Sequence, residues 1–327
     1  MKTQSAMLLG TLVGRADHTV FVAVSRVVAI AALIILLAIL SPQFLTWGNF
    51  VNVARQASLQ FLIAAGLTIV VLTGGIDLAV GAILGLAACL SASLISQGHV
   101  AWGIASALLS GLACGSVNGL LITYGRIPAF IATYGMLWIA HGLGYVFMKG
   151  EVIYGLPEAV RFIGVGFIGP IPVPVVVAVA LLIALHVMLH GTVLGRAIYA
   201  IGGNPGAARL SGMPVKRRLI TVYALSGLLS GFAALVVIAR VNAADSSLGE
   251  DMLLSAIASV CLGGTSLFGG VGGIVGTAIG SLILALVVNG MNLLGVETFW
   301  QSGVMGAIIL ASVLADQLGG SRLIGKR

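Results

Sequence analysis

Long apolar stretches separated by short polar ones run along almost the whole chain. A transmembrane helix needs about 20 apolar residues to cross a bilayer, and about ten stretches approach that length. The pattern predicts an all-α polytopic membrane protein with helices at residues 20–40, 52–73, 77–97, 101–124, 129–148, 171–190, 218–240, 252–268, 272–292 and 298–316. The eighth of these segments is short and rich in glycine at its end, so it is continuous, re-entrant or broken.

The composition excludes the main soluble classes of protein. Apolar residues make up 59% of the 327 residues and charged residues only 8%, whereas an ordinary soluble domain has roughly 25% charged residues. So little polar surface excludes a soluble enzyme, a nucleic-acid-binding protein and a secreted disulfide-rich domain. The three cysteines lie inside apolar stretches at unrelated spacings, and they indicate neither disulfides nor a zinc site.

No soluble domain interrupts the apolar stretches. We therefore expect residues 1–327 to form a single transmembrane domain, with residues 19–316 embedded in the membrane. Only two connecting loops are long, 149–170 and 191–217. The N-terminal residues lack a short apolar core followed by a small-residue cleavage site, so the apolar stretch that begins near Val20 is expected to be a retained helix.

Positive charges gather on one side of the predicted membrane. Lys and Arg are enriched in the cytoplasmic loops of membrane proteins. If both termini are cytoplasmic, twelve of the 16 Lys and Arg residues fall on that side, and the outer side holds only Arg55, Lys149, Arg161 and Arg240. The bias predicts cytoplasmic termini, with loop 191–217 in the cytoplasm and the other long loop in the periplasm. The net charge of +7 therefore reflects topology in a lipid membrane, and no nucleic-acid partner is expected.

Two patterns resemble known chemical sites, but the residues around them do not fit those sites. His186 and His190 have the spacing of a zinc site, but Val187 stands where metalloproteases carry Glu, and no third ligand is evident. The glycines of residues 164–169 are spaced as in a dinucleotide-binding loop, but prolines follow where a helix should begin. The sequence has no phosphate-binding P-loop motif and no paired intramembrane carboxylates. It therefore indicates no catalytic, cofactor-binding or metal site in this chain.

Glycines recur at four-residue intervals within several apolar stretches. Small residues at this spacing let two membrane helices approach each other closely. Three of them in register, at Gly111, Gly115 and Gly119, predict a packed interface on one helix. The same interval recurs at Gly81 and Gly85, Gly227 and Gly231, and Gly272, Gly276 and Gly280.

The cytoplasmic loop contains the signals of one short helix. Asn204 is a good N-cap, Pro205 suits the first helical position and Gly212 suits the position after the end. A helix of under two turns is not stable alone in water, so it must be held by its flanks or by a partner. Such a helix is either a docking site for a partner or a simple surface turn.

Four motifs of this chain resemble those of ABC importer permeases of the ribose/xylose/arabinose type. Ala207, Ala208 and Gly212 match the Ala-Ala-x-x-x-Gly part of the coupling motif of ABC importer permeases, although Gly206 replaces its leading Glu and its downstream Ile-x-Leu-Pro is absent. The sequence around this motif is similar to that of the sugar-transporting subgroup of these permeases. The other three motifs are LTGGIDLAVG at 72–81, PAFIAT at 128–133 and LGGTSLFGG at 262–270.

This resemblance implies a permease subunit of an ATP-driven monosaccharide importer in a bacterial inner membrane. Permeases of this type work in pairs, with two cytoplasmic ATPases that bind ATP and Mg²⁺ and a periplasmic sugar-binding protein that delivers the substrate. Their fold resembles that of the vitamin B12 importer permease, with ten helices and a cytoplasmic coupling helix after the sixth. The coupling residues implied here are Asn204, Pro205, Ala207, Ala208, Arg209 and Gly212.

One carboxylate stands inside the apolar region. Asp77 follows the turn-forming residues 73–75, so it either caps the next helix or lines a translocation path. Several other polar residues within the predicted helices offer donors and acceptors to a hydroxyl-rich solute, or else hydrogen-bond between helices. These further candidates for the path are Asn118, Thr133, His141, Asn289 and Asn292.

The sequence leaves one other functional class open. An ion-coupled secondary transporter of a small polar solute would also have about ten helices, but it should display intramembrane ionisable groups or unwound ion sites. Apart from Asp77, this chain shows few such groups. The transported solute is expected to be a pentose, a hexose or a related solute, and the sequence does not distinguish among them.

Overall fold

Helices make up nearly all of the regular structure. The computed structural model describes residues 28–324, with side chains described for residues 28–314. The helices are Val28–Leu40, α2 (Trp47–Leu72), α3 (Val80–Ser96), α4 (Val100–Thr123), α5 (Ala129–Met148), α6 (Glu158–Val165), α7 (Val173–Gly191), α8 (Val193–Gly203), α9 (Pro205–Leu210), α10 (Val215–Val241), α11 (Met252–Leu262), α12 (Ile274–Leu293) and α13 (Thr298–Ile324).

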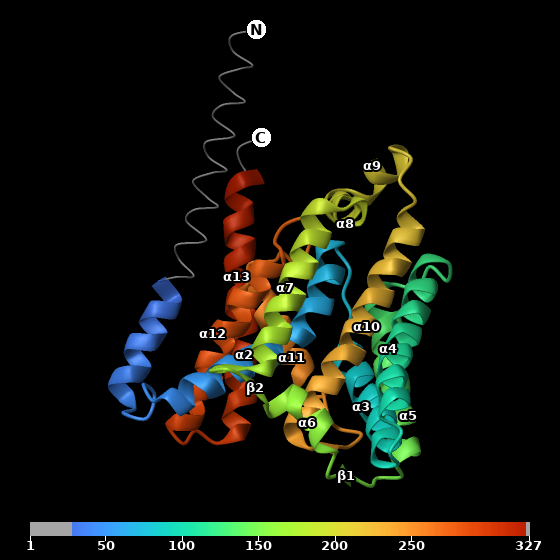
Figure 1. Ribbon diagram of the computed structural model, residues 1–327. Coiled ribbons are helices and arrows are strands. Elements are labelled where there is room, and N and C mark those ends of the chain that lie inside the picture. The colour runs from blue at the N-terminus through green and yellow to red at the C-terminus, as the bar shows by residue number, and fades with distance from the viewer. Residues whose placement is uncertain (1–27, 325–327) are drawn as a thin grey trace.

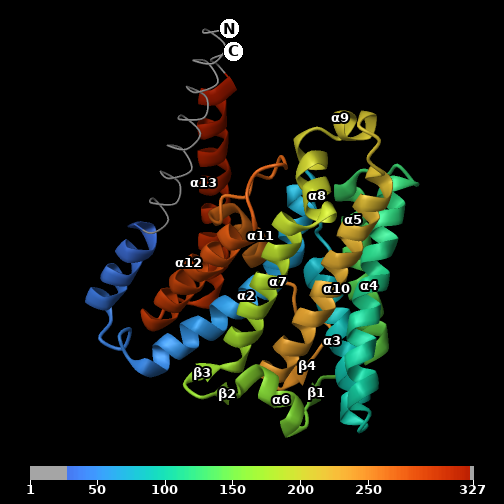
Figure 2. The same ribbon diagram turned by 45° about the horizontal axis from the view of Figure 1, so that its top comes forward.

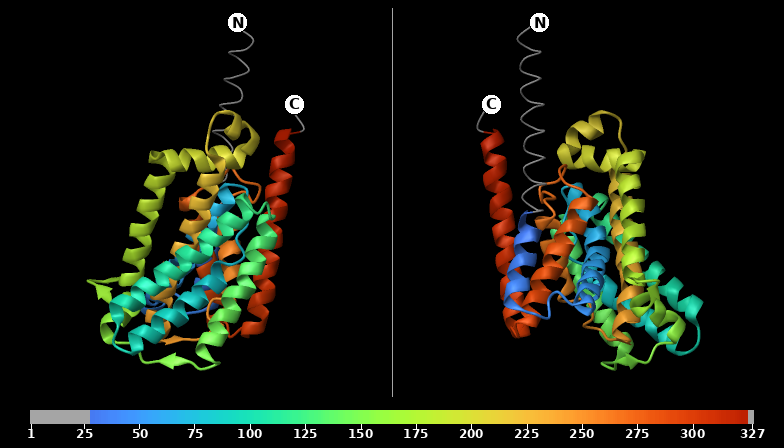
Figure 3. Two further views of the ribbon diagram at one scale, coloured as in Figure 1. Left: turned by 90° about the vertical axis from the view of Figure 1, so that its right-hand side faces the viewer. Right: turned by 60° about the vertical axis from the view of Figure 1, so that its left-hand side comes forward.

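The helices are arranged between two distinct ends of the molecule. Helix α9 and the C-terminal end of α13 lie at one end, which we call the α9 end (Figure 1). The opposite end, the β1 end, carries α6 and the short strands β1 to β4 (Figures 1 and 2). Helix α8 lies crosswise to α7 at the α9 end (Figure 3). The predicted loops 191–217 and 149–170 therefore lie at opposite ends.

The segment between α5 and α7 is more ordered than the loop expected at 149–170. It contains α6 and three two-residue strands, β1 (Ile153–Tyr154), β2 (Phe167–Ile168) and β3 (Ile171–Pro172). Strand β1 pairs antiparallel with β4 (Ala243–Ala244), which follows α10, and β2 pairs with β3. The pairing of β1 with β4 joins this segment to the C-terminal end of α10.

Six of the described helices are long and apolar enough to cross a membrane, namely α2, α4, α5, α7, α10 and α12. Shorter apolar helices occupy Val28–Leu40, Val80–Ser96, Val193–Gly203, Met252–Leu262 and Thr298–Leu314. The prediction of a multi-pass helical membrane protein is confirmed. The number of crossings and the side of the membrane on which the termini lie stay predictions, and residues 20–27 of the first predicted helix lie outside the described residues.

The eighth predicted helix is broken. It was expected over 252–268, but α11 ends at Leu262, and its 11 residues span only about 16 Å. Gly264 and Gly269 beyond it have φ of 68° and 89°, a left-handed conformation that ends a helix. The chain then continues as a loop, residues 263–273, before α12 begins.

A close helix crossing joins α4 to α10. A Cβ added at Gly111 or Gly115 would overlap the α10 backbone at Gly227 or Tyr223. The interface predicted from the glycine spacing in α4 is therefore confirmed. Gly81 and Gly85 of α3 have a different partner. A Cβ added at either glycine would overlap the backbone of loop residues 246–249, so these glycines make room for a loop and not for a second helix.

Burial divides the helices into a central and a peripheral group. The second half of α2 and most of α10 are buried, including Leu62 and Val237 at 0% exposure. The outer helices expose large apolar side chains such as Leu109, Trp138 and Ile183. Because lipid is as apolar as these side chains, such exposure is the pattern expected of a membrane protein. The two buried helices thus form the support on which the functional residues are placed.

The α4–α10 crossing gives a testable prediction for stability. Gly111→Ala should lower the free energy of unfolding by about 1–3 kcal/mol, because the new methyl group forces the two backbones apart. The matched control is Gly135→Ala in α5, where an added Cβ meets no atom within 4 Å. Thermal unfolding in detergent measures both variants, and equal midpoints would contradict the close crossing.

Candidate functional site

The short helix α9 forms as its sequence signals predict. The side chain of Asn204 accepts a hydrogen bond from the Ala207 amide at 2.9 Å, and Pro205 occupies the first position. Gly212, just beyond the end, has φ of 78°. Because both ends are satisfied by local contacts, six residues form a stable helix at the tip of the molecule.

The predicted coupling residues divide between two faces of α9. Ala208 is buried against Ile201 of α8 and Val215 of α10, so it anchors α9 to the rest of the chain. The remaining five residues predicted to couple are exposed. The sequence analysis missed Leu210, whose side chain is 91% exposed. The sequence could have indicated this residue, because Leu210 is the one large apolar residue within the predicted helix.

Helix α8 connects α9 to the interior. The hydroxyl of Tyr199 donates to the Gly272 carbonyl at 3.0 Å. Burial raises the pKa of Tyr199, which keeps this phenol protonated as the donor. In the same loop, the Gly270 amide donates to the Leu72 carbonyl at the end of α2, at 2.9 Å. Loop 263–273 is therefore held between α8 and α2.

Asp77 lies in a non-helical junction between α2 and α3. It is fully buried, its Oδ1 accepts from the Ala79 amide at 3.0 Å, and its Oδ2 accepts from the Ser226 hydroxyl of α10 at 2.8 Å. Helix α3 begins later than expected, at Val80, so Asp77 closes the turn just before the helix. Both carboxylate oxygens are occupied by protein donors.

Two other predicted polar residues, Thr133 on α5 and Asn118 on α4, are also buried. The Thr133 hydroxyl donates to the Ala129 carbonyl at 2.8 Å and contacts the Ile76 carbonyl at 3.4 Å. Asn118 on α4 is fully buried, and neither atom of its amide has a hydrogen-bond partner in the described chain. Neither residue lines the two cavities described next.

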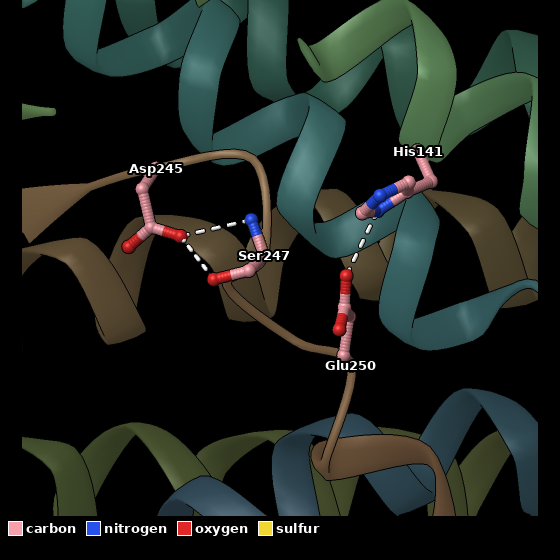
Figure 4. Close-up of polar contacts among 4 residues, drawn as sticks. All are labelled: His141, Asp245, Ser247 and Glu250. Atoms are coloured by element: carbon pink, nitrogen blue, oxygen red, sulfur yellow. Dashed lines mark hydrogen bonds and ion pairs between the residues drawn. The ribbon is translucent and has the colours of Figure 1, made fainter. Parts of the chain in front are cut away.

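His141 lies beside a cavity of about 310 Å³ between α3, α5 and the start of α11. Its Nδ1 lies 3.0 Å from Oε1 of Glu250, which also lines this cavity (Figure 4). Asp245 in the same loop accepts from the Ser247 amide at 2.8 Å (Figure 4). The loop is thus tied to α5 by a polar contact.

An aromatic stripe continues from this cavity along α5. The ring of His141 lies 6.2 Å from that of Trp138, Trp138 lies 6.3 Å from Tyr134, and Tyr134 stacks 6.0 Å from Phe130. The four residues recur at intervals of three and four, so they share one face of the helix. Phe130, Tyr134 and Trp138 are each about half exposed.

Asn289 and Asn292 belong to a second, larger cavity of about 500 Å³ toward the β1 end. The amide of Asn289 forms a reciprocal pair with that of Asn49, at 2.7 and 3.1 Å. The sequence analysis missed the amides that α2 contributes, although their spacing along one helix face was visible. The polar residues that line this amide cavity are Asn49, Asn52, Gln56, Gln60, Arg240, Ser255, Asn289 and Asn292.

Comparison with known proteins assigns the chain to a family. A family model described as "Branched-chain amino acid transport system / permease component" matches residues 49–313. The chain belongs to this permease family. With six long apolar helices, the permease is a multi-pass protein of the inner membrane, and its relatives are transport subunits and not enzymes. No solved structure matches the chain.

Several relatives named for sugar transport match the permease over most of both lengths. It is 42% identical over 294 residues to the ribose import permease RbsC of Escherichia coli strain K12, covering 88% of this chain and 92% of the relative. It is 46% identical over 288 residues to RbsC of Bacillus subtilis, covering 87% and 89%. The D-allose permease AlsC of E. coli K12 is 38% identical over 294 residues, covering 88% and 90%.

The buried carboxylate of the permease gives a second testable prediction. Asp77→Ala should destabilise the protein by about 1–3 kcal/mol, because the Ala79 amide and the Ser226 hydroxyl lose their buried acceptor. Asp77→Asn keeps one carbonyl oxygen and should lose less. Thermal unfolding in detergent tests both, with Asp251→Ala at an exposed carboxylate as control. A stability loss no greater than that control would show that the junction does not need Asp77.

Proposed function

We propose that this chain is the membrane permease subunit of an ATP-driven importer of a monosaccharide. The observation that carries the proposal is its similarity, over nearly nine-tenths of both lengths, to permeases named for ribose and allose. An L-arabinose permease of Azospirillum brasilense, AraH, is also 35% identical over 307 residues. A pentose or a closely related hexose is therefore the expected solute.

The proposed assembly follows from this role. Two permease subunits, identical or different, enclose the path, two cytoplasmic ATPases bind ATP and Mg²⁺, and a periplasmic binding protein delivers the sugar. We place about ten crossings, in a fold like that of the vitamin B12 importer permease, within residues 19–316. Both termini and the α9 end are assigned to the cytoplasm, and the β1 end to the periplasm.

Coupling to the ATPase is assigned to α9. Its exposed residues present Pro205, Arg209 and Leu210 to solvent. A projecting apolar side chain flanked by a positive charge suits insertion into a groove of a partner protein. Closure of the two ATPases on ATP would move α9, and α8 would pass that movement to loop 263–273, which it contacts through Tyr199.

The path for the sugar is assigned to polar residues within the bundle. Asn289 and Asn292 line the amide cavity and His141 lines the smaller one, which supports a role for these three in solute passage. Asp77, Asn118 and Thr133 stay candidates that would contact solute only if the bundle opened. No observation favours an ion-coupled mechanism, because both oxygens of the one carboxylate in the α2–α3 junction are bonded to protein donors.

Uptake by cells tests the proposed function. A strain without its own ribose permease should accumulate radiolabelled ribose when it expresses this chain with its genetically linked ATPase and binding protein. Omission of any one of the three proteins should abolish uptake, because none can replace another. Ribose, allose and arabinose compared in competition identify the preferred solute, and uptake that persists without the ATPase would contradict the proposal.

The coupling role of α9 gives a separate prediction. Leu210→Asp should reduce co-purification of the ATPase about tenfold or more, because a charge replaces an apolar anchor at the interface. Leu294→Asp, at an exposed apolar residue just after α12, is the matched control and should leave co-purification unchanged. Equal loss in both variants, or none in either, would contradict docking at α9. Ala208 is unsuitable for this test, because its substitution would detach α9 from α8.

A further inference from the structure

We propose that a group of cations at the α9 end binds the phosphate of an anionic phospholipid headgroup. Arg126 lies in the turn between α4 and α5, and Lys216, Arg217 and Arg218 lie within the first four residues of α10. We call these four residues the basic cluster. The binding of a lipid there does not depend on which solute the permease carries.

The crossing of α4 and α10 brings the two parts of the basic cluster together. The crossing continues toward the α9 end, where a Cβ added at Gly119 would overlap the backbone of Ile220. The end of α4 therefore lies beside the start of α10 (Figure 2). There, Nζ of Lys216 lies 4.9 Å from the ring centre of Tyr124, the residue that follows α4. Arg126 is two residues beyond this contact, so cations from two distant segments share one small area.

The basic cluster has no acidic partner within the described part of the chain. The one ion pair among the described residues joins His141 to Glu250. Nε of Arg218 is buried and has no hydrogen-bond partner there either. Apart from the buried Asp77, the carboxylates with described side chains lie in connections at the β1 end, namely Glu151, Glu158, Asp245, Glu250, Asp251 and Glu297. The charge of the cluster is therefore available to an anion from outside the chain.

The three cations of α10 lie at the unfavourable end of their helix. The N-terminus of a helix carries a partial positive charge, which anions stabilise and cations do not. Helix α10 has no acidic residue in its first turn, and Pro214 before it provides no side-chain cap. A phosphate bound by the cluster would offset the repulsion among Lys216, Arg217, Arg218 and the helix end.

The surface beside the basic cluster favours a lipid over a soluble anion. Leu109, Val117 and Leu120 are exposed and are spaced as on one face of α4, which ends at the exposed ring of Tyr124. Exposed apolar faces of membrane proteins lie against lipid. Tyrosine is enriched at the boundary between membrane and water, and lysine extends toward the headgroups. The cluster thus lies where cations meet the phosphates of anionic lipids.

The basic cluster also lies next to the proposed coupling helix. Only residues 211–214 separate α9 from the start of α10, and Ala208 of α9 packs against Val215. A headgroup bound by Lys216 and Arg217 would hold this end of α10, and with it α9, at the membrane surface. We therefore expect anionic lipid to increase ATP-driven transport. This consequence rests on the proposed function, whereas the binding itself does not.

Retention of lipid by the full-length permease tests the binding. The purified chain in detergent is titrated with phosphatidylglycerol or with phosphatidylcholine of the same acyl chains, and native mass spectrometry measures how much lipid stays bound. The wild-type chain should retain phosphatidylglycerol in preference to phosphatidylcholine. Arg126→Gln/Lys216→Gln should weaken retention of phosphatidylglycerol about tenfold, because it removes one cation from each segment of the cluster.

Two matched double variants show whether the effect depends on the cluster and on its charge. Lys149→Gln/Arg196→Gln removes the same charge at exposed positions outside the cluster and should leave retention unchanged. Arg126→Lys/Lys216→Arg keeps the charge and should also retain phosphatidylglycerol. Thermal unfolding of all three double variants confirms that the fold is kept.

Four results would overturn lipid binding at the basic cluster. These are equal retention of the two lipids by the wild-type chain, equal loss in the glutamine variants inside and outside the cluster, and displacement of phosphatidylglycerol by an excess of inorganic phosphate, which would indicate a site for a free anion. The fourth is a cluster variant that keeps its lipid but no longer co-purifies with the ATPase, which would indicate a protein interface.

Transport by the full complex in liposomes tests the consequence for coupling. Replacement of phosphatidylglycerol by phosphatidylcholine should reduce ATP-driven sugar uptake severalfold with the wild-type permease. With Arg126→Gln/Lys216→Gln, uptake should be low in both lipids. Equal wild-type uptake in both lipids would contradict the link to coupling. If no sugar is transported in either lipid, the proposed function fails, while lipid retention by the purified chain still decides the binding site.

Discussion

Backbone that leaves the helical state inside a membrane protein must have its polar groups satisfied by the protein itself. This constraint governs two breaks in the bundle, the one between α2 and α3 and the one after α11, because hydrocarbon offers no hydrogen bonds. The α2–α3 break is closed by Asp77, which accepts from Ala79 and Ser226. The break after α11 is closed by the bond from the Gly270 amide to the Leu72 carbonyl. Without these contacts the short helices α3 and α11 could not begin and end within the bundle.

The same contacts join the α9 end to the interior. Ala208 fixes α9 to α8, Tyr199 fixes α8 to loop 263–273, and that loop is bonded to the end of α2. Along α2 toward the β1 end lie first Thr68, whose hydroxyl is hydrogen-bonded to that of Thr277, and then Gln60, Gln56 and Asn52, which line the amide cavity. The element that we assign to the ATPase and the amide cavity are therefore supported by one central helix. Rigid helices that share such contacts are the means by which a movement at one end reaches the other.

Local signals made much of this structure predictable. Hydropathy placed the long helices, and Asn204, Pro205 and Gly212 defined α9, because capping depends on a few neighbouring residues. The spacing of Gly111 and Gly115 correctly predicted a close crossing, although it did not name α10 as the partner. Such features depend on residues close together in the sequence.

Features that depend on distant residues were not predictable. The pair of Asn49 and Asn289 joins residues 240 positions apart, so the amide cavity could not be assembled from the sequence. The burial of Ala208 depends on packing against Val215, and only the structure showed that Leu210 is the exposed residue. The end of α11 at Leu262 is different, because it depends on a local signal, the left-handed Gly264 that follows, and the glycine-rich sequence had already left a break there open.

We expect ATP hydrolysis by a partner to drive sugar through this permease. Reconstitution of the purified permease and ATPase in liposomes, with binding protein and labelled sugar on one side and ATP supplied to the ATPase, tests it most directly. Sugar accumulation should require hydrolysable ATP and should be unchanged by ionophores. Accumulation driven by an ion gradient in the absence of ATP would contradict it.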